Sequence, residues 1–158
     1  MGAGTIIATA IAVTLLIITG YVLIGGTLST AQVVAKAQQA AADREALKVH
    51  TRIEIINASS NTTTEQTFIE MKNTGSEVVG DFRHMDVYLL QGGVPTAYTN
   101  QSGSWTLTIS PDQVHPNLLD PGEIANITVL YSQALGSPTW VKVTTANGVY
   151  ASAYTRED

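Results

Sequence analysis

The chain lacks cysteine altogether, and charged side chains make up only 13% of its 158 residues. Without cysteine it can form neither a disulfide framework nor a thiolate metal site. A formal net charge of −5 argues against nucleic-acid binding, because no basic surface is available to neutralise phosphates. A glycine-rich phosphate loop is also missing, as is any alternation of helix and strand patterns, so a nucleotide-binding α/β fold is excluded.

Charge is missing entirely from the N-terminal region, where no charged side chain precedes Lys36. Residues 5–28 form an apolar run of 24 residues, and about 20 are enough to span the hydrocarbon core of a bilayer. A cleaved secretory signal would have a basic start and a shorter apolar core. We therefore expect a helix that is retained in a membrane or a filament, and a soluble cytoplasmic protein is excluded.

Small residues recur along this apolar helix, and small side chains let helices approach closely in lipid. The helix-packing candidates are Ala8, Ala12, Gly20, Gly25 and Gly26, although Gly is also common in membrane helices in general. Residues 29–48 continue the helix with Ala, Gln, Lys and Glu, which favour helix formation, and with no Gly or Pro. We predict a first domain over residues 1–48, a transmembrane or filament-core helix followed by a stalk.

Beyond residue 48 the apolar residues recur at every second position, which is typical of half-buried strands. The alternation predicts about seven strands, the first from Val49 to Ile55 and the others near Ile69, Val87, Leu107, Ile127, Val141 and Tyr150. Turns are predicted at residues 120–123 (DPGE) and at Asn147-Gly148. Residues 49–158 therefore predict an immunoglobulin-like β-sandwich, and the fold class is α+β: a long N-terminal hydrophobic helix followed by an all-β domain.

Two signals disagree about the side of the membrane on which the β-domain lies. Basic residues follow the apolar helix and none precedes it, which by the positive-inside rule favours a cytoplasmic β-domain. Four Asn-X-Ser/Thr sequons favour the outside of the cell instead. The N-glycosylation candidates are Asn57, Asn61, Asn100 and Asn126. We expect the β-domain to lie outside.

One cluster of polar residues has a composition that could suit a divalent metal. Asp81, His84 and Asp86 lie within six residues, and alternation would place His84 and Asp86 on one face of a strand. Arg83 lies between them and favours an ordinary charged surface. We predict no metal site here.

A second polar group, Asp112, His115 and Asp120, lies in one predicted loop, but no serine in a nucleophile context accompanies it. The chain is therefore not predicted to be an enzyme: it has no catalytic residue, no cofactor site and no small-molecule substrate site. A membrane-tethered enzyme or solute receptor is disfavoured for the same reason.

Several segments carry a resemblance to a known family. In the helical region these are residues 4–13 (GTIIATAIAV), 22–26 (VLIGG) and 31–36 (AQVVAK), and in the β-region residues 72–76 (KNTGS), 86–90 (DVYLL) and 120–129 (DPGEIANITV). Together with the Thr-rich β-region they resemble the archaeal type IV pilin-like proteins, and in particular components of the archaellum, the swimming filament of archaea.

The resemblance implies two possible roles. Filament subunits of this family are made with a short basic leader, whereas Met1-Gly2 opens directly onto the helix here, as in the accessory archaellum family FlaF (also called ArlF). The FlaF resemblance implies a cell-surface stator protein anchored in the cytoplasmic membrane, whose β-sandwich binds the surface-layer protein and other archaellum components. A mature chain could also begin at this point, so a structural subunit of the extracellular filament, polymerised through its N-terminal helix, is the alternative. Self-association is expected in both roles.

Overall fold

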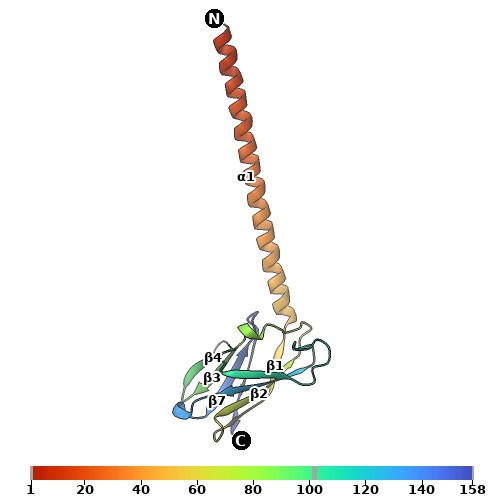
Figure 1. The fold of residues 1–158 in the computed structure, drawn as a ribbon, viewed down its shortest axis with the longest axis vertical. Helices are drawn as coiled ribbons and strands as arrows, with labels where there is room; N and C mark the ends of the chain where they lie inside the picture. The colour runs from red at the N-terminus through yellow and green to blue at the C-terminus, as the bar shows by residue number, and fades with distance from the viewer. Residues whose placement is uncertain (1, 101–102, 158) are drawn as a thin grey trace. The chain divides into compact units, whose positions relative to one another are not determined.

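The computed structural model describes residues 2–100 and 103–157. The chain divides into two compact units, one up to Asp43 and one from Arg44 onward. Helix α1 spans Ala3–His50 without interruption (Figure 1) and none of its residues is buried. Its 48 residues correspond to a length of about 72 Å at 1.5 Å per residue. The prediction of a long N-terminal helix is confirmed.

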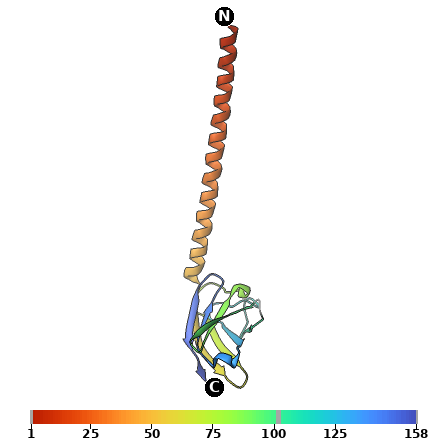
Figure 2. The ribbon, with the colours of Figure 1, turned by 90° about the vertical axis from the view of Figure 1, so that its left-hand side faces the viewer.

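The second unit is built from two β-sheets (Figures 1 and 2). One sheet has the strand order β5-β6-β2-β1-β9 and the other β4-β3-β7-β8. The strands within the described residues are β1 (Ile53–Asn61), β2 (Gln66–Asn73), β3 (Asp86–Gln91), β4 (Val94–Thr99), β5 (Trp105–Ile109), β6 (Ile124–Leu130), β7 (Pro138–Thr144), β8 (Tyr150–Tyr154) and β9 (Arg156–Glu157). All neighbouring strands are antiparallel except β1 and β9, which are parallel.

The hydrophobic core lies between the two sheets, because every second residue of the central strands points inward. In β2 and β6 the inward residues include Ile69, Met71 and Ile127, and in β3 and β7 they include Leu89 and Val141, all with at most 1% of their surface exposed. Each such burial contributes about 1.5–3 kcal/mol to stability. The predicted β-sandwich and the α+β class are confirmed.

The first predicted strand is wrong at its start. Alternation favoured a strand from Val49, but α1 continues to His50 and β1 begins only at Ile53. The helix end is stabilised by residues far along the chain: the carbonyl of His50 accepts hydrogen bonds from the N–H groups of Ser76 (3.0 Å) and Glu77 (3.2 Å). The alternation of neighbouring residues carries no information about hydrogen bonds from such distant residues, so it could not predict where the helix ends.

Two strands were not predicted. Strand β4 contains Pro95, which weakens a strand pattern but is tolerated at a sheet edge, where β4 lies. Strand β9 is only Arg156 and Glu157, both exposed, so it has no apolar periodicity to detect. Both pair at the margins of their sheets, and the core does not depend on them.

Candidate interaction surfaces of the helix and the β-domain

The threonines in the N-terminal part of α1 bond to the backbone of their own segment. Each of the six threonines from Thr5 to Thr30 donates its hydroxyl proton to a backbone carbonyl three or four residues earlier in the chain, at distances of 2.8–3.0 Å. A hydroxyl bonded in this way presents no unsatisfied donor to lipid or to a neighbouring apolar helix. By length and composition α1 is able to cross a membrane.

The second half of α1 has a different surface. Asp43, Arg44 and Glu45 are consecutive, and successive residues of a helix point about 100° apart, so these charges face three sides. Lys36 and Lys48 add charge one to two turns away on either side. This part of the helix is therefore suited to water and not to burial on all sides.

The predicted helix-packing residues all lie on α1 and are not buried. A Cβ atom added at Gly20, Gly25 or Gly26 would meet nothing within 4 Å. Since each glycine in a helix interior costs about 1 kcal/mol relative to alanine, the chain itself does not explain their presence. Contact with another helix would explain it, and this role stays a prediction.

The C-terminal end of α1 is bonded to two loops of the β-domain. Thr51 donates its N–H and its hydroxyl proton to the carbonyl of Leu47, at 2.9 and 2.7 Å. The side chain of Asn147, in the predicted hairpin turn, donates to the Thr51 hydroxyl oxygen at 2.7 Å. Gly75 approaches from the other loop and donates its N–H to the carbonyl of Arg52 at 2.9 Å. The end of the helix is thus part of the second compact unit.

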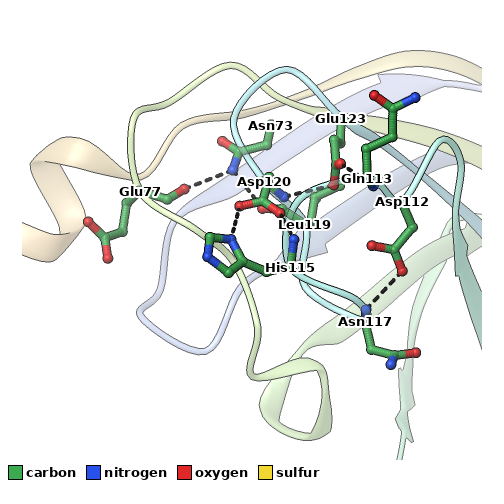
Figure 3. A network of polar contacts seen from close by, with 9 residues as sticks. All are labelled: Asn73, Glu77, Asp112, Gln113, His115, Asn117, Leu119, Asp120 and Glu123. Carbon is green, nitrogen blue, oxygen red and sulfur yellow. Dashed lines mark hydrogen bonds and ion pairs between the residues drawn. The ribbon is translucent and has the colours of Figure 1, made fainter.

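The loop between β5 and β6 contains a network of buried carboxylates (Figure 3). Asp120 is buried, and its two carboxylate oxygens bond to His115: Oδ2 accepts the backbone N–H at 3.0 Å, and Oδ1 lies 2.8 Å from the ring Nδ1. Glu123, also buried, accepts the N–H of Gln113 and of Asp120, each at 3.1 Å. All four carboxylate oxygens are therefore used by the loop itself.

This network joins the loop to a neighbouring loop of the β-domain. Asn73 donates from its side-chain amide to the carbonyls of Leu119 (2.9 Å) and Glu77 (2.8 Å), which joins this loop to the one that caps α1 (Figure 3). Among the described residues no group of three His, Asp or Glu side chains could hold a metal ion. The sequence grouped Asp112, His115 and Asp120 in one loop but did not point to Asn73 or Glu123. Asn73 bonds to Leu119 on a distant segment, and Glu123 bonds to backbone N–H groups of its own loop, for which residue types give no signal.

The hydrogen bond from His115 keeps the pKa of the Asp120 carboxyl below its ordinary value, and this outweighs burial, which acts in the opposite direction. A carboxyl with a lowered pKa stabilises the folded state fully above its unfolded pKa of about 3.9. That stabilisation is lost as the pH falls through the folded-state pKa.

We accordingly expect Asp120→Asn to lower the melting temperature of the β-domain at pH 7, with a difference from wild type that narrows below about pH 4. Thermal unfolding followed by near-UV circular dichroism from pH 7 to pH 3 measures this. Glu54→Gln, which also replaces a carboxyl by an amide but at an exposed position of β1, serves as the control. A difference for Asp120→Asn that is constant over this range would show that its charge is not what stabilises the loop.

The structure separates the two residues that were expected to share a strand face. His84 ends a short 3-10 helix, Phe82–His84, and its Nδ1 lies 2.8 Å from an Asp81 carboxylate oxygen, whereas Asp86 begins β3. The expectation that His84 and Asp86 lie on one strand face is wrong, because His84 belongs to the 3-10 helix and only Asp86 belongs to the strand. The exposed His84–Asp81 pair is an ordinary surface contact.

Two sequon asparagines lie on the outer face of the larger sheet. Asn57 in β1 and Asn126 in β6 each pair with Glu70 in β2, so the three residues form one row across the strands. Asn57 is exposed and Asn126 is half-buried. Glycans at these positions would cover this face of the sandwich.

The other two sequon asparagines take part in local hydrogen bonds. The Asn61 side-chain oxygen accepts the N–H groups of Thr63 and Thr64, at 2.9 and 3.0 Å. The Asn100 Nδ2 donates to the carbonyl of Phe82 at 3.2 Å. Residues 101 and 102, which complete the Asn100 sequon, lie outside the described residues.

Comparison with known proteins assigns these features to a family. A model of archaeal-type flagellins matches residues 2–154. An uncharacterized protein of Archaeoglobus fulgidus is 27% identical over 158 residues, which cover 97% of this chain and 95% of the relative. Two solved structures from Sulfolobus acidocaldarius are similar at 25% identity and a TM-score of 0.49: the archaellum periplasmic stator protein FlaG, and the stator complex of FlaF and FlaG. Each match covers 65% of this chain, together with 97% and 87% of the respective solved chains.

Proposed function

Because the chain belongs to the archaeal-type flagellin family, we propose that it is a stationary component of the archaellum, anchored in the cytoplasmic membrane by α1 and bound to the surface layer through its β-domain. Family membership confirms the expectation of a non-catalytic, structural protein. In the proposed role residues 1–48 are the anchor and stalk, and residues 49–158 form the external domain. A rotating filament needs such a fixed attachment, since otherwise the motor housing would turn instead.

The division of α1 into two unlike halves carries this proposal. The uncharged run of residues 5–28 is about 36 Å long as a helix, which is close to the roughly 30 Å of a bilayer core. The following part presents charges on three sides, which favours an aqueous stalk above the membrane over a helix buried among other helices. Binding then takes place on the surfaces of the β-domain.

Fractionation of cells tests the proposal. Filaments are sheared from intact cells, and the protein is quantified by mass spectrometry in the filament and membrane fractions. A stationary anchor stays in the membrane at low copy number and co-purifies with surface-layer protein after mild crosslinking. Recovery in the sheared filament in the amount of a main subunit would overturn the proposal.

An external β-domain also leads to a prediction about glycosylation. The attachment atom is the asparagine Nδ2, which at Asn100 is bonded to the Phe82 carbonyl, whereas none of the described hydrogen bonds uses the exposed Asn57 side chain. We expect Asn57→Gln to remove the mass of one glycan from the intact protein and Asn100→Gln to leave the mass of the glycans unchanged. Intact-mass spectrometry of protein from the native membrane measures both. Absence of any glycan would remove the support that the sequons give to an external domain.

The family itself favours a second candidate, a structural subunit of the filament, because a flagellin is the protein from which such filaments are built. In this role α1 would pack against copies of itself, and its small residues would form the contacts. The fractionation experiment separates this candidate from the first. Helix packing can be tested in both.

We expect Gly25→Leu to weaken association between α1 helices by roughly tenfold, or about 1.4 kcal/mol. Leucine fits the isolated chain, because a Cβ at this position meets nothing within 4 Å, and it favours helix more than glycine does. A loss of association must then come from the contact between helices. Co-purification of differently tagged chains in detergent measures it, with Ala35→Leu as the control. Equal association of Gly25→Leu and wild type would show that Gly25 does not lie in a helix contact.

A further inference from the structure

Strand β5 forms one margin of the larger sheet and pairs only with β6 within the described residues. The N–H of Leu130 donates to the carbonyl of Ser104, and the N–H of Ser110 donates to the carbonyl of Ile124, both at 3.0 Å. In an antiparallel ladder the peptide groups of every second residue bond to the same neighbouring strand. The peptide groups of the even-numbered residues of β5 therefore point toward β6. The peptide groups of Trp105, Leu107 and Ile109 therefore point to the open edge.

The other sheet margins are protected against further pairing, and β5 is not. Strand β4 carries Pro95, which has no N–H to donate. Strand β9 is two residues long and both are charged, and β8 lies against β1. The five residues of β5, WTLTI, contain no charge and no proline and have a high strand propensity. Unprotected edges of this kind are templates for another strand.

A groove of about 560 Å³ runs along the open edge of β5. It is lined by the strand itself together with Phe82, Asn100, Asp112 and Asn117. Leu107 and Ile109 pack against the core but are only partly buried, because no strand of the described part of the chain covers them on this side. A further strand at this edge would complete their burial and satisfy the open peptide groups.

We propose that β5 pairs antiparallel with β5 of a second copy of this chain, about a two-fold axis at Leu107. The sequence of the strand is self-complementary about this residue: Thr106 faces Thr108 of the other copy, and Trp105 faces Ile109. Inward-pointing residues thus stay inward in both copies, as register requires. Because the strand is uncharged, two chains of net charge −5 can pair along it without bringing like charges together within the strand. The two larger sheets become one continuous sheet.

This register has a geometric consequence that the absence of cysteine makes testable. Thr106 and the partner's Thr108 form a non-hydrogen-bonded pair, in which the Cα atoms lie about 4.5 Å apart. Thr106 and the partner's Thr106 are diagonal neighbours at about 7–8 Å. Only the first distance lies within the roughly 4.4–6.8 Å that a disulfide spans. Both threonines are exposed, so replacing them leaves the core unchanged.

The first experiment uses full-length chains with different tags, one carrying Thr106→Cys and one Thr108→Cys, co-expressed and oxidised in native membranes. We expect a disulfide between the two chains in severalfold higher yield than from Thr106→Cys alone or Thr108→Cys alone. Thr128→Cys, on the same sheet face but one strand away from the edge, is the control and should remain monomeric on a non-reducing gel. Equal yields for the mixed and single chains, or crosslinks only to a protein of different mass, would overturn the proposal.

A second experiment tests the register through charge. Thr106→Lys combined with Thr108→Lys places like charges opposite each other twice, whereas Thr106→Lys with Thr108→Glu places opposite charges together. We expect the first double variant to dissociate at roughly tenfold higher concentration than the second, measured by sedimentation equilibrium in detergent. Thermal unfolding of both shows whether they are folded. Equal dissociation constants for two folded variants would overturn the pairing, whichever fraction of the cell contains the protein.

Discussion

Replacing Gly75 by alanine is expected to lower the free energy of unfolding of the β-domain by about 3 kcal/mol or more. A Cβ at this position would lie 2.4 Å from the backbone nitrogen of Arg52 and 2.5 Å from the carbonyl oxygen of His50. Neither atom can move easily, since the His50 carbonyl accepts two further hydrogen bonds and Gly75 itself donates to the Arg52 carbonyl. Urea unfolding of the full chain in detergent, followed by near-UV circular dichroism, measures the loss.

Gly80→Ala is the matched control for this prediction. Its added Cβ would lie 2.6 Å from Cδ2 of Leu118, which is the end of a flexible side chain and can turn away. We therefore expect Gly80→Ala to lower the free energy of unfolding by only about 1 kcal/mol. If the two substitutions lower the free energy of unfolding equally, the close approach of Gly75 to the backbone of His50 and Arg52 does not require a glycine at this position.

Ile17→Lys, near the middle of the uncharged run, is expected to release the protein from the membrane. Exchanging isoleucine for lysine at the centre of a membrane helix costs about 3–4 kcal/mol, which corresponds to a shift of more than a hundredfold in partitioning. The hydroxyls of Thr14 and Thr19 are bonded to backbone carbonyls of the helix, whereas a charged lysine ammonium at this depth would have to be taken out of water. The fraction retained in carbonate-washed membranes is the measurement.

Ala37→Lys provides the comparison in the second half of the same helix. This position lies one residue after Lys36, in the part that already carries charge, and is exposed. Membrane retention of Ala37→Lys should equal that of wild type. Full retention of Ile17→Lys would mean that residues 5–28 do not span the bilayer, and the anchoring proposal would then have to be abandoned.

Local patterns were sufficient for the helix and for most of the sheet residues. The uncharged run predicted α1 because membrane-length helices depend on composition alone. Strands β2, β3 and β6 were predicted around Ile69, Val87 and Ile127 because one face of each packs on the core and the period of two is then visible. The Asn147-Gly148 turn was predicted from residue type, and Gly148 does adopt a positive φ of 84° there.

The polar network of the β5–β6 loop could be predicted only in part. Asp120 and His115 are five residues apart and were recognised as one loop group, but their direct bond depends on how the loop folds. Asn73 bonds to Leu119, 46 residues later in the chain, and no spacing rule connects two such positions. Hydrogen bonds between distant segments follow from the packing of the strands that carry them.

By itself, then, the amino-acid sequence determined the helix, its division into an uncharged and a charged half, and which residues of the central strands point inward. These properties depend on neighbouring residues and on burial, which composition and periodicity express directly. Only the tertiary structure decided that the helix ends at His50, that Asp120 is buried against His115, and that β5 lies at an open margin of its sheet. The reason is that strand order and long-range hydrogen bonds join segments whose separation along the chain leaves no local signal.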